Sequence, residues 1–300
     1  MRLWIVGNGF DRAHGLATGY SDYYKFLVGN GEEWMASMLE FYFGNVSGHP
    51  GNILWSQLEK ALGIYSIDAI YDFLKEGHAL DIDHVSQYVG EVEAEVQYHF
   101  VEICEKFSET FTNWCHSIEL KKVKPISQFG FTTNDLFLTF NYTDTLEYVY
   151  GIDEGKVLHI HGRAASGDEL IVGHNNPATM PKDIEDDFLD NTANIRAIVE
   201  TVNKLEKKTK RIIAVNSPFF GSLGSIDDVM VYGHSIEEVD LPYFEEVNKN
   251  VDQNAKWTFC CYDESKVEHY KGVAQMLGLG KSRYSIEGQM LHRGKDKRKN

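Results

Sequence analysis

The chain has 300 residues, of which 43% are hydrophobic and 13% aromatic, and this composition excludes a disordered chain without a core. Its formal net charge of -16 at pH 7 argues against a protein that coats nucleic acid, because affinity for phosphate comes from clustered Lys and Arg. A small anionic nucleotide that is held by local backbone N–H groups stays compatible with this charge.

The first predicted strand covers residues 3–6 and leads into a glycine-rich turn at residues 7–11, which read GNGFD. A buried strand, a glycine turn and a helix start let backbone N–H groups approach a phosphate. The match to the dinucleotide fingerprint G-x-G-x-x-G is partial, because Arg12 stands at its third glycine. The alternative is a plain strand-to-helix turn that needs a positive φ.

Residues 21–128 are predicted to form a helical insert. Apolar residues from Val85 to Trp114 recur at steps of three and four, which predicts one helix on the order of 45 Å long. Shorter helices are expected over residues 22–43 and 55–74. Such apolar stripes are more often core than function, and the alternative is a surface that binds a second copy of the chain.

Four further strands are predicted where apolar runs end in Gly, Asn, His or Ser. They cover residues 136–140, 157–160, 169–172 and 229–232. Ligands of open α/β sheets lie outside the carboxyl ends of the strands, so these ends and the first turn predict one pocket. The strands that end before His161 and Gly173 could instead form an antiparallel hairpin, which would take His174 out of the pocket.

The rest of the chain completes an α/β pattern. Helices are expected at residues 184–189 and 192–208, a last strand at 256–262 and a last helix at 266–277. We therefore predict one α/β domain over residues 1–300, Rossmann-like, with a mainly parallel sheet, flanking helices and the helical insert. The basic residues 293–300 are expected to be a solvated tail.

The cysteines and the hydropathy pattern favour a cytoplasmic protein. Cys104, Cys115, Cys260 and Cys261 have no metal-site spacing, and we expect them to be reduced thiols. The sequence shows no signal peptide and no apolar run of about 18 residues, so no membrane is expected among the partners.

Several segments together resemble one known family. They are GNGFD at residues 7–11, HG at 14–15, Thr18, YSDY at 20–23, TFNYTDTLE at 139–147, HIHG at 159–162, GH at 173–174, GHS at 233–235 and VDLPYF at 239–244. This combination closely resembles the AbiH family of bacterial phage abortive-infection proteins and spans nearly the whole chain. The resemblance implies antiviral defence and a phage-derived trigger.

A more distant similarity is to sirtuin-type NAD-binding proteins. In those a Gly-Ala-Gly-x-Ser turn, a Thr-x-Asn-x-Asp segment, a His-Gly catalytic pair and a Gly-Thr-Ser segment follow in this order. The matching positions are Gly7 and Gly9, Thr139 and Asn141, His161 and Gly162, and Gly233 and Ser235. Asp11, Thr143 and His234 depart from the pattern, which has Ser, Asp and Thr there. The four-cysteine zinc module of deacetylating sirtuins has no counterpart, so the similarity favours sirtuin-like relatives that cleave NAD in phage defence.

The sirtuin similarity implies a hydrolase that binds NAD and cleaves its nicotinamide-ribose bond without a metal. Asn141 would fix the ribose because its amide both donates and accepts, and His161 would act as the base because imidazole titrates near 6.5. The other expected nucleotide-binding residues are Gly7, Asn8, Gly9, Phe10, Asp11, Thr139, Asp144, Gly233, His234 and Ser235. The alternative role of Asn141, Thr143 or Asp144 is to cap a turn or helix, and Ser235 or Asp240 could cap a helix near Leu241.

Two other functions remain open from the sequence. His159 and His161, with His174 or His234 and carboxylates such as Asp11 or Asp144, could bind a divalent metal in a phosphoesterase or nuclease. A nucleotide sensor that binds its ligand unaltered, while the insert contacts a partner, is the non-catalytic alternative. The chain has neither a Walker-type lysine nor a G-x-S-x-G elbow, which argues against an ATPase and an α/β-hydrolase.

Overall fold

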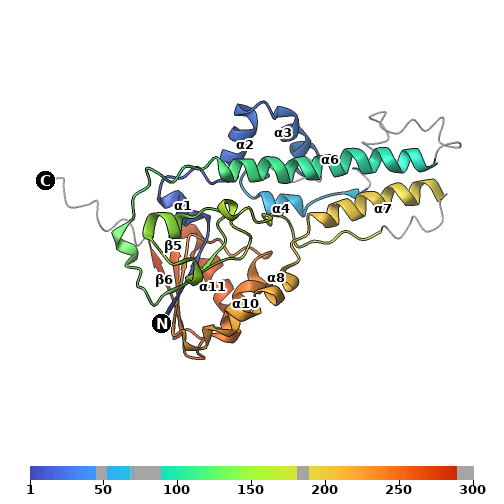
Figure 1. Cartoon of the computed structure of the whole chain (residues 1–300). Coiled ribbons are helices and arrows are strands. Elements are labelled where there is room, and N and C mark those ends of the chain that lie inside the picture. Colours follow the sequence, from blue (N-terminus) through green and yellow to red (C-terminus); the bar gives the residue numbers. More distant parts are fainter. Residues whose placement is uncertain (45–52, 68–69, 71–88, 181–188, 289–300) are drawn as a thin grey trace. The chain divides into compact units, whose positions relative to one another are not determined.

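The protein is described from a computed structural model, which covers residues 1–44, 53–67, 70, 89–180 and 189–288 (Figure 1). The chain divides into two compact units. The α/β unit contains Met1–Thr18, Cys115–Leu170 and Lys208–Asn300, and the helical unit contains Gly19–Trp114 and Ile171–Lys207. The helical unit thus includes most of the predicted insert and, in addition, a segment after residue 170.

The α/β unit is built on a six-stranded sheet in which every neighbouring pair is parallel. Its strands are β1 (Arg2–Val6), β2 (Leu136–Thr139), β3 (Val157–His159), β4 (Asp228–Tyr232), β5 (Lys256–Cys261) and β6 (Tyr284–Gly288). The strand order is β3-β2-β1-β4-β5-β6, which is the doubly wound Rossmann arrangement. The predicted α/β class is therefore confirmed, and the sheet is wholly parallel among the described strands.

Alternate residues of each strand enter two different cores, because successive side chains point to opposite faces of a sheet. Leu3 and Ile5 of β1 belong to one core cluster, while Trp4 and Val6 belong to the other. With both faces of β1 buried, its sequence is a continuous apolar run rather than an alternating one.

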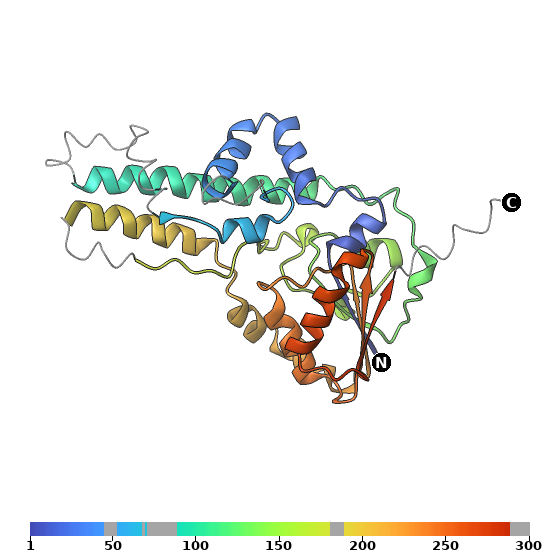
Figure 2. The same ribbon diagram turned by 180° about the vertical axis from the view of Figure 1, so that it is seen from behind.

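Helices cover both faces of the sheet. Those of the first face are α8 (Thr209–Val215), α9 (Ser217–Gly221), α10 (Leu241–Asn250) and α11 (Val267–Met276), and Figures 1 and 2 show α10 and α11 on the same side. The second face is covered by α1 (Asn8–Ala13), the short 3-10 helix η3 (Ser127–Phe129) and the short π-helix η4 (Thr145–Val149). The sequence did not predict α8, α9 or β6.

The strand predicted at residues 169–172 is wrong. These residues form no strand, and the chain passes there from the α/β unit, which ends this segment at Leu170, into the helical unit. Only an isolated bridge between His174 and Glu206 follows. The backbone of Gly173 packs so closely on Leu205 that a Cβ at Gly173 would lie 1.9 Å from the Leu205 carbonyl oxygen. An apolar run that crosses between units has no neighbouring strand to pair with.

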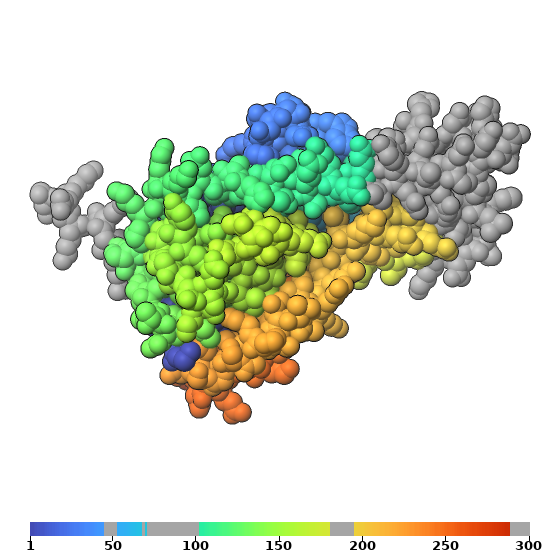
Figure 3. Space-filling model, viewed as in Figure 1, coloured from blue at the N-terminus to red at the C-terminus, as the bar shows by residue number. Residues whose placement is uncertain are grey.

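The helix predicted at 22–43 is divided into shorter ones, and residues 68–69 and 71–74 of the helix predicted at 55–74 lie outside the described residues. The helical unit contains one long helix and several shorter ones. They are α2 (Tyr20–Gly29), α3 (Glu33–Leu39), α4 (Leu58–Leu62), α6 (Val89–His116), which ends in the α/β unit, and α7 (Leu189–Lys204). Figure 3 shows α2 and α3, in blue, at the surface of the face in view. The long predicted helix is α6, whose first expected residues, 85–88, lie outside the described residues, as do 184–188 and the basic tail 293–300.

All four cysteines are free, as predicted for reduced thiols, and burial raises the pKa of Cys104 and Cys260 to about 12. None of the helices in the described part of the chain combines the length and apolar composition needed to cross a bilayer.

Candidate functional site

The carboxyl edge of the sheet in the α/β unit gathers most of the residues singled out from the sequence. The strand order reverses between β1 and β4, so this pair forms the topological switch point at which open α/β sheets bind ligands. Val6 and Tyr232 are register partners at the end of this pair, and Gly7 and Gly233 follow them directly. The segments after β2 and β3 lie on the other side of β1.

The turns after β1 and β4 interlock through their glycines. The backbone N–H of Gly9 donates to the carbonyl oxygen of Gly233 at 2.8 Å. A Cβ on Gly9 would lie 2.6 Å from Cα of Gly233, and a Cβ on Gly7 would lie 2.8 Å from Cα of His234. Gly233 itself has a φ of 69°. These glycines therefore permit the close approach of two backbones. The space that a side chain at Gly9 would occupy is filled by Gly233.

A buried carboxylate, Asp11, joins the start of α1 to the loop after β2. Its oxygens accept hydrogen bonds from the hydroxyls of Thr143 at 2.6 Å and Thr145 at 2.7 Å, and the side chain of Asn141 also hydrogen-bonds to it. Asp11 is 1% exposed. Burial raises the pKa of Asp11 to about 6, although these hydrogen bonds and the nearby His159 act in the opposite direction.

Two buried histidines face one carboxylate, Asp240. His161 Nε2 lies 3.7 Å from one oxygen of Asp240, and His234 Nε2 lies 3.5 Å from the other. The backbone N–H of Ile236 donates to Nδ1 of His234 at 2.8 Å. Nδ1 is therefore an acceptor, and the ring proton of neutral His234 is on Nε2, toward Asp240.

The turn that places His234 is strained. Ile236 is 2% exposed and has a φ of 51°, an unfavourable conformation for a β-branched residue. Such outliers persist where the surrounding structure holds them, and they cluster at functional sites. Here the conformation directs the Ile236 N–H to the His234 ring.

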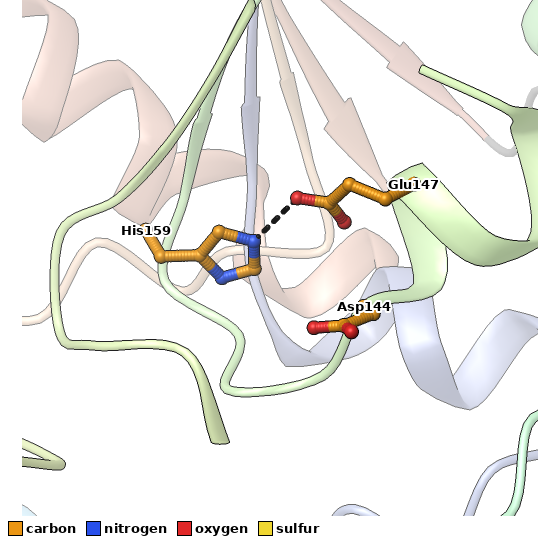
Figure 4. Close-up of side chains that lie close together, drawn as sticks. All are labelled: Asp144, Glu147 and His159. Carbon is orange, nitrogen blue, oxygen red and sulfur yellow. Dashed lines mark hydrogen bonds and ion pairs between the residues drawn. The ribbon is translucent and has the colours of Figure 1, made fainter. Parts of the chain in front are cut away.

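His159 forms a second arrangement with two carboxylates. His159 Nε2 lies 2.8 Å from Oε1 of Glu147, and Asp144 is the third member of the group (Figure 4). Asp144 also forms a two-point ion pair with Arg163, at 2.8 and 3.1 Å. Sequence reasoning missed Glu147. The available signal was its position three residues after Asp144, which puts both on one side of a helical turn.

The structure brings some predicted residues together and separates others. Thr139 ends β2, Asn141, Asp144 and His161 lie on the segments after β2 and β3, and Gly7–Asp11 meets Gly233 and His234. The Phe10 side chain lies in the aromatic core with Phe129 and Tyr150, and Ser235 is exposed.

The metal set proposed from the sequence is not assembled. His174 belongs to the helical unit, where Val202 O and Asn176 N contact its two ring nitrogens. His159 and His161 contact different carboxylates, Glu147 and Asp240. Among the described residues, the group whose ligand atoms lie close enough for one ion is Asp144, Glu147 and His159.

The capping role predicted for Ser235 or Asp240 is wrong. Asp240 is the N-cap residue of α10 by position, but its side chain makes no capping hydrogen bond. Its two oxygens instead face His161 and His234. A carboxylate at the start of a helix can either cap the helix or pair with neighbouring side chains. Here Asp240 is oriented toward the two histidines.

A cavity of about 440 Å³ lies at the other edge of the sheet. Its lining includes Asp135 and Lys156, which directly precede β2 and β3, together with Phe131 and Tyr150. We assign the candidate site to the carboxyl edge because the buried residues Asp11, His161, His234 and Asp240 lie on segments that follow the strands there.

Comparison with known families identifies the relatives of the chain. The family model for bacteriophage abortive infection AbiH matches residues 3–261. The chain belongs to the AbiH family. This confirms the resemblance drawn from the sequence and supports a role in abortive infection by bacteriophage. None of the curated proteins and none of the solved structures gives a significant match.

Proposed function

We propose that this AbiH protein binds a nucleotide at the carboxyl edge of its sheet and cleaves NAD at the nicotinamide-ribose bond. The observation that supports the proposal best is a set of contacts at this edge. Asn141 hydrogen-bonds to Asp11, which follows the first glycine turn, and His161 faces the same carboxylate, Asp240, as His234 of the second glycine turn. Rossmann sheets of this strand order bind dinucleotides in the crevice at the switch point, here between β1 and β4. The similarity to sirtuin motifs gives the reaction.

The proposed chemistry requires a group that holds the ribose and a base of nearly neutral pKa. Positive charge develops on the ribose as the bond to nicotinamide breaks, and a water then attacks with loss of a proton. Asn141 would hold the ribose hydroxyls, and Asp11 would position Asn141 through its hydrogen bond. His161 would accept the proton from the water, and Asp240 would stabilise the imidazolium that forms.

Nicotinamide release from NAD by the full-length protein tests the proposal. We expect wild type to release nicotinamide and His161→Gln and Asn141→Ala to lose roughly 100-fold or more in turnover, the effect of removing a positioned acid-base or substrate-holding group. His116→Gln is the matched control, because His116 is an exposed histidine of the same unit whose ring contacts only the Ala164 carbonyl among the described polar groups. Circular dichroism checks that each variant is folded.

Other outcomes would favour other functions. Binding of NAD without release of nicotinamide, also in extracts of phage-infected cells, would contradict cleavage and support a sensor. Activity on phosphodiesters that a chelator removes and a divalent ion restores would contradict the NAD reaction and support a metal-dependent phosphoesterase.

A further inference from the structure

The acid–imidazole cluster, which consists of Asp144, Glu147 and His159, has the composition and spacing of a cation site. One ligand atom from each residue lies within 4.8 Å of the other two. The ligand atoms of a tetrahedral Zn²⁺ site lie roughly 3.3 Å apart, so these side chains would have to close by at most about 1.5 Å to hold one ion. The cluster is not part of the residues proposed above to hold ribose or accept the proton, although Asp144 neighbours them.

The hydrogen bonds of His159 orient its ring as metal-binding histidines are oriented. Nδ1 lies 3.0 Å from the backbone carbonyl oxygen of Asn141, which can only accept, so Nδ1 carries a proton. In neutral histidine Nε2 then has a free lone pair directed at Glu147. Metal-binding histidines typically donate their second N–H to a carbonyl or carboxylate in this way, which leaves the other nitrogen for the metal.

The contact between His159 and Glu147 needs a positive charge. The Nε2 lone pair and the Glu147 carboxylate oxygen are both acceptors, and they lie 2.8 Å apart. A proton between them satisfies this geometry, and a divalent cation bound by both atoms would also supply the positive charge, with the two atoms roughly 0.5 Å farther apart. The side chains of His159 and Glu147 are only 7% and 8% exposed, so water screens this charge weakly.

The second oxygen of Glu147 favours a divalent cation over a proton as the partner of this pair. In the described part of the chain this buried atom, Oε2, has no hydrogen-bond partner. Buried carboxylate oxygens without a donor are rare and costly, and a bound ion is one of the ordinary explanations. Figure 4 shows this oxygen on the side of the carboxylate toward Asp144. A cation held by Asp144 and His159 would contact it there, whereas a proton on His159 would not.

Arg163 supports the cluster without closing it. Its guanidinium donates one hydrogen bond to each oxygen of Asp144 and also pairs with Glu154 at 2.9 Å. Each carboxylate oxygen has a second lone pair that remains able to bind a metal. Arg163 therefore fixes the orientation of Asp144, as outer partners of metal-binding carboxylates do.

We infer that Asp144, Glu147 and His159 bind one divalent transition-metal ion of the Zn²⁺ or Mn²⁺ class. One imidazole and two carboxylates suit these ions better than Ca²⁺ or Mg²⁺, which prefer oxygen ligands alone. Three protein ligands leave coordination positions open for water or phosphate oxygens, as in catalytic zinc sites. The inference is independent of NAD cleavage and replaces the expectation of a metal-free protein.

Equilibrium dialysis of the full-length, metal-stripped protein against Zn²⁺ or Mn²⁺, read by elemental analysis, tests this site. We expect one ion per chain for wild type. Glu147→Gln removes one ligand charge and keeps the side-chain volume, and we expect it to weaken binding at least about 10-fold, the smallest loss typical of the outer partners alone. Glu154→Gln is the matched control, since Glu154 is 72% exposed and contacts Arg163 outside the cluster.

A second measurement keeps the inference testable if a variant folds poorly. Mn²⁺ bound to wild type should show coupling to a single imidazole nitrogen in pulsed electron paramagnetic resonance, and His159→Gln should lose that coupling. Wild type that retains no ion, or Glu147→Gln that binds as tightly as wild type, would overturn the site.

Discussion

Asp11 is the titratable residue of the candidate site that is most fully shielded from solvent. It is an acid with 1% exposure whose partners are hydroxyls and an amide rather than a cation in contact. Burial outweighs these hydrogen bonds and raises its pKa to about 6. The folded protein therefore binds a proton at Asp11 at pH values where the unfolded chain has lost it.

This pKa predicts a pH-dependent contribution of Asp11 to stability. The contribution is fully present below about pH 4, the unfolded pKa, and is lost as the pH rises through about 6. Asp11→Asn cannot ionise. Its free energy of unfolding, compared with that of wild type, should therefore rise by up to about 3 kcal/mol as the pH is raised from about 4 to about 7. Urea unfolding of both proteins across this range measures the difference, and a constant difference would contradict the pKa.

At the scale of elements, the interlocked turns after β1 and β4 explain why both are glycine-rich. The sequence predicted that Gly9 leaves room for a phosphate. The structure shows that Gly233 of the neighbouring turn lies where a Gly9 Cβ would be, and that the turns are joined by a hydrogen bond. Binding of a phosphate by residues 7–11 stays a prediction. A larger residue at Gly9 would displace the turn at Gly233, so loss of phosphate binding in such a variant would not by itself show that the phosphate lies at Gly9.

Gly9→Ala is therefore expected to destabilise the α/β unit. The new Cβ would overlap Gly233, and we expect a loss of about 1–3 kcal/mol, as for other overpacked sites. Gly272→Ala is the matched control: no atom of the described residues lies within 4 Å of its Cβ position in α11, and Ala should stabilise that helix by up to about 1 kcal/mol. Thermal unfolding followed by circular dichroism distinguishes the two. Equal stability of Gly9→Ala and wild type would show that the turns separate easily.

At the scale of the whole molecule, the sequence predicted the parts of the fold that depend on local patterns. The apolar run of β1 identified a strand buried on both faces, and the stripe of α6 identified a long helix. The same type of run at residues 169–172 gave a wrong strand, because pairing depends on which neighbours the chain meets there. β6 was missed because Tyr284 and Ile286 are its only apolar residues and none of its five residues is fully buried.

The candidate site was predictable to the extent that parallel strands bring their carboxyl ends to one edge. This rule correctly related Gly7 and Gly9 to His234 and Gly233, which are more than 200 positions away in the sequence. It could not show which partner each side chain selects. Asp240 faces two histidines instead of capping α10, and His159 contacts Glu147, because these choices depend on orientations set by tertiary contacts.

The membership of the AbiH family connects this edge with a measurable phenotype of the whole protein. If the chemistry at the carboxyl edge carries the abortive-infection role, His161→Gln should abolish protection of bacteria against phage, because the variant keeps the fold and lacks the base. His116→Gln, which changes an exposed histidine, should protect as well as wild type. Plaque counts on cells that express each variant at the same level measure protection, and the cellular NAD content measured after infection shows whether protection coincides with NAD loss. Full protection by His161→Gln would mean that the protein acts through binding at another surface, and that turnover at this edge is not how it stops the phage.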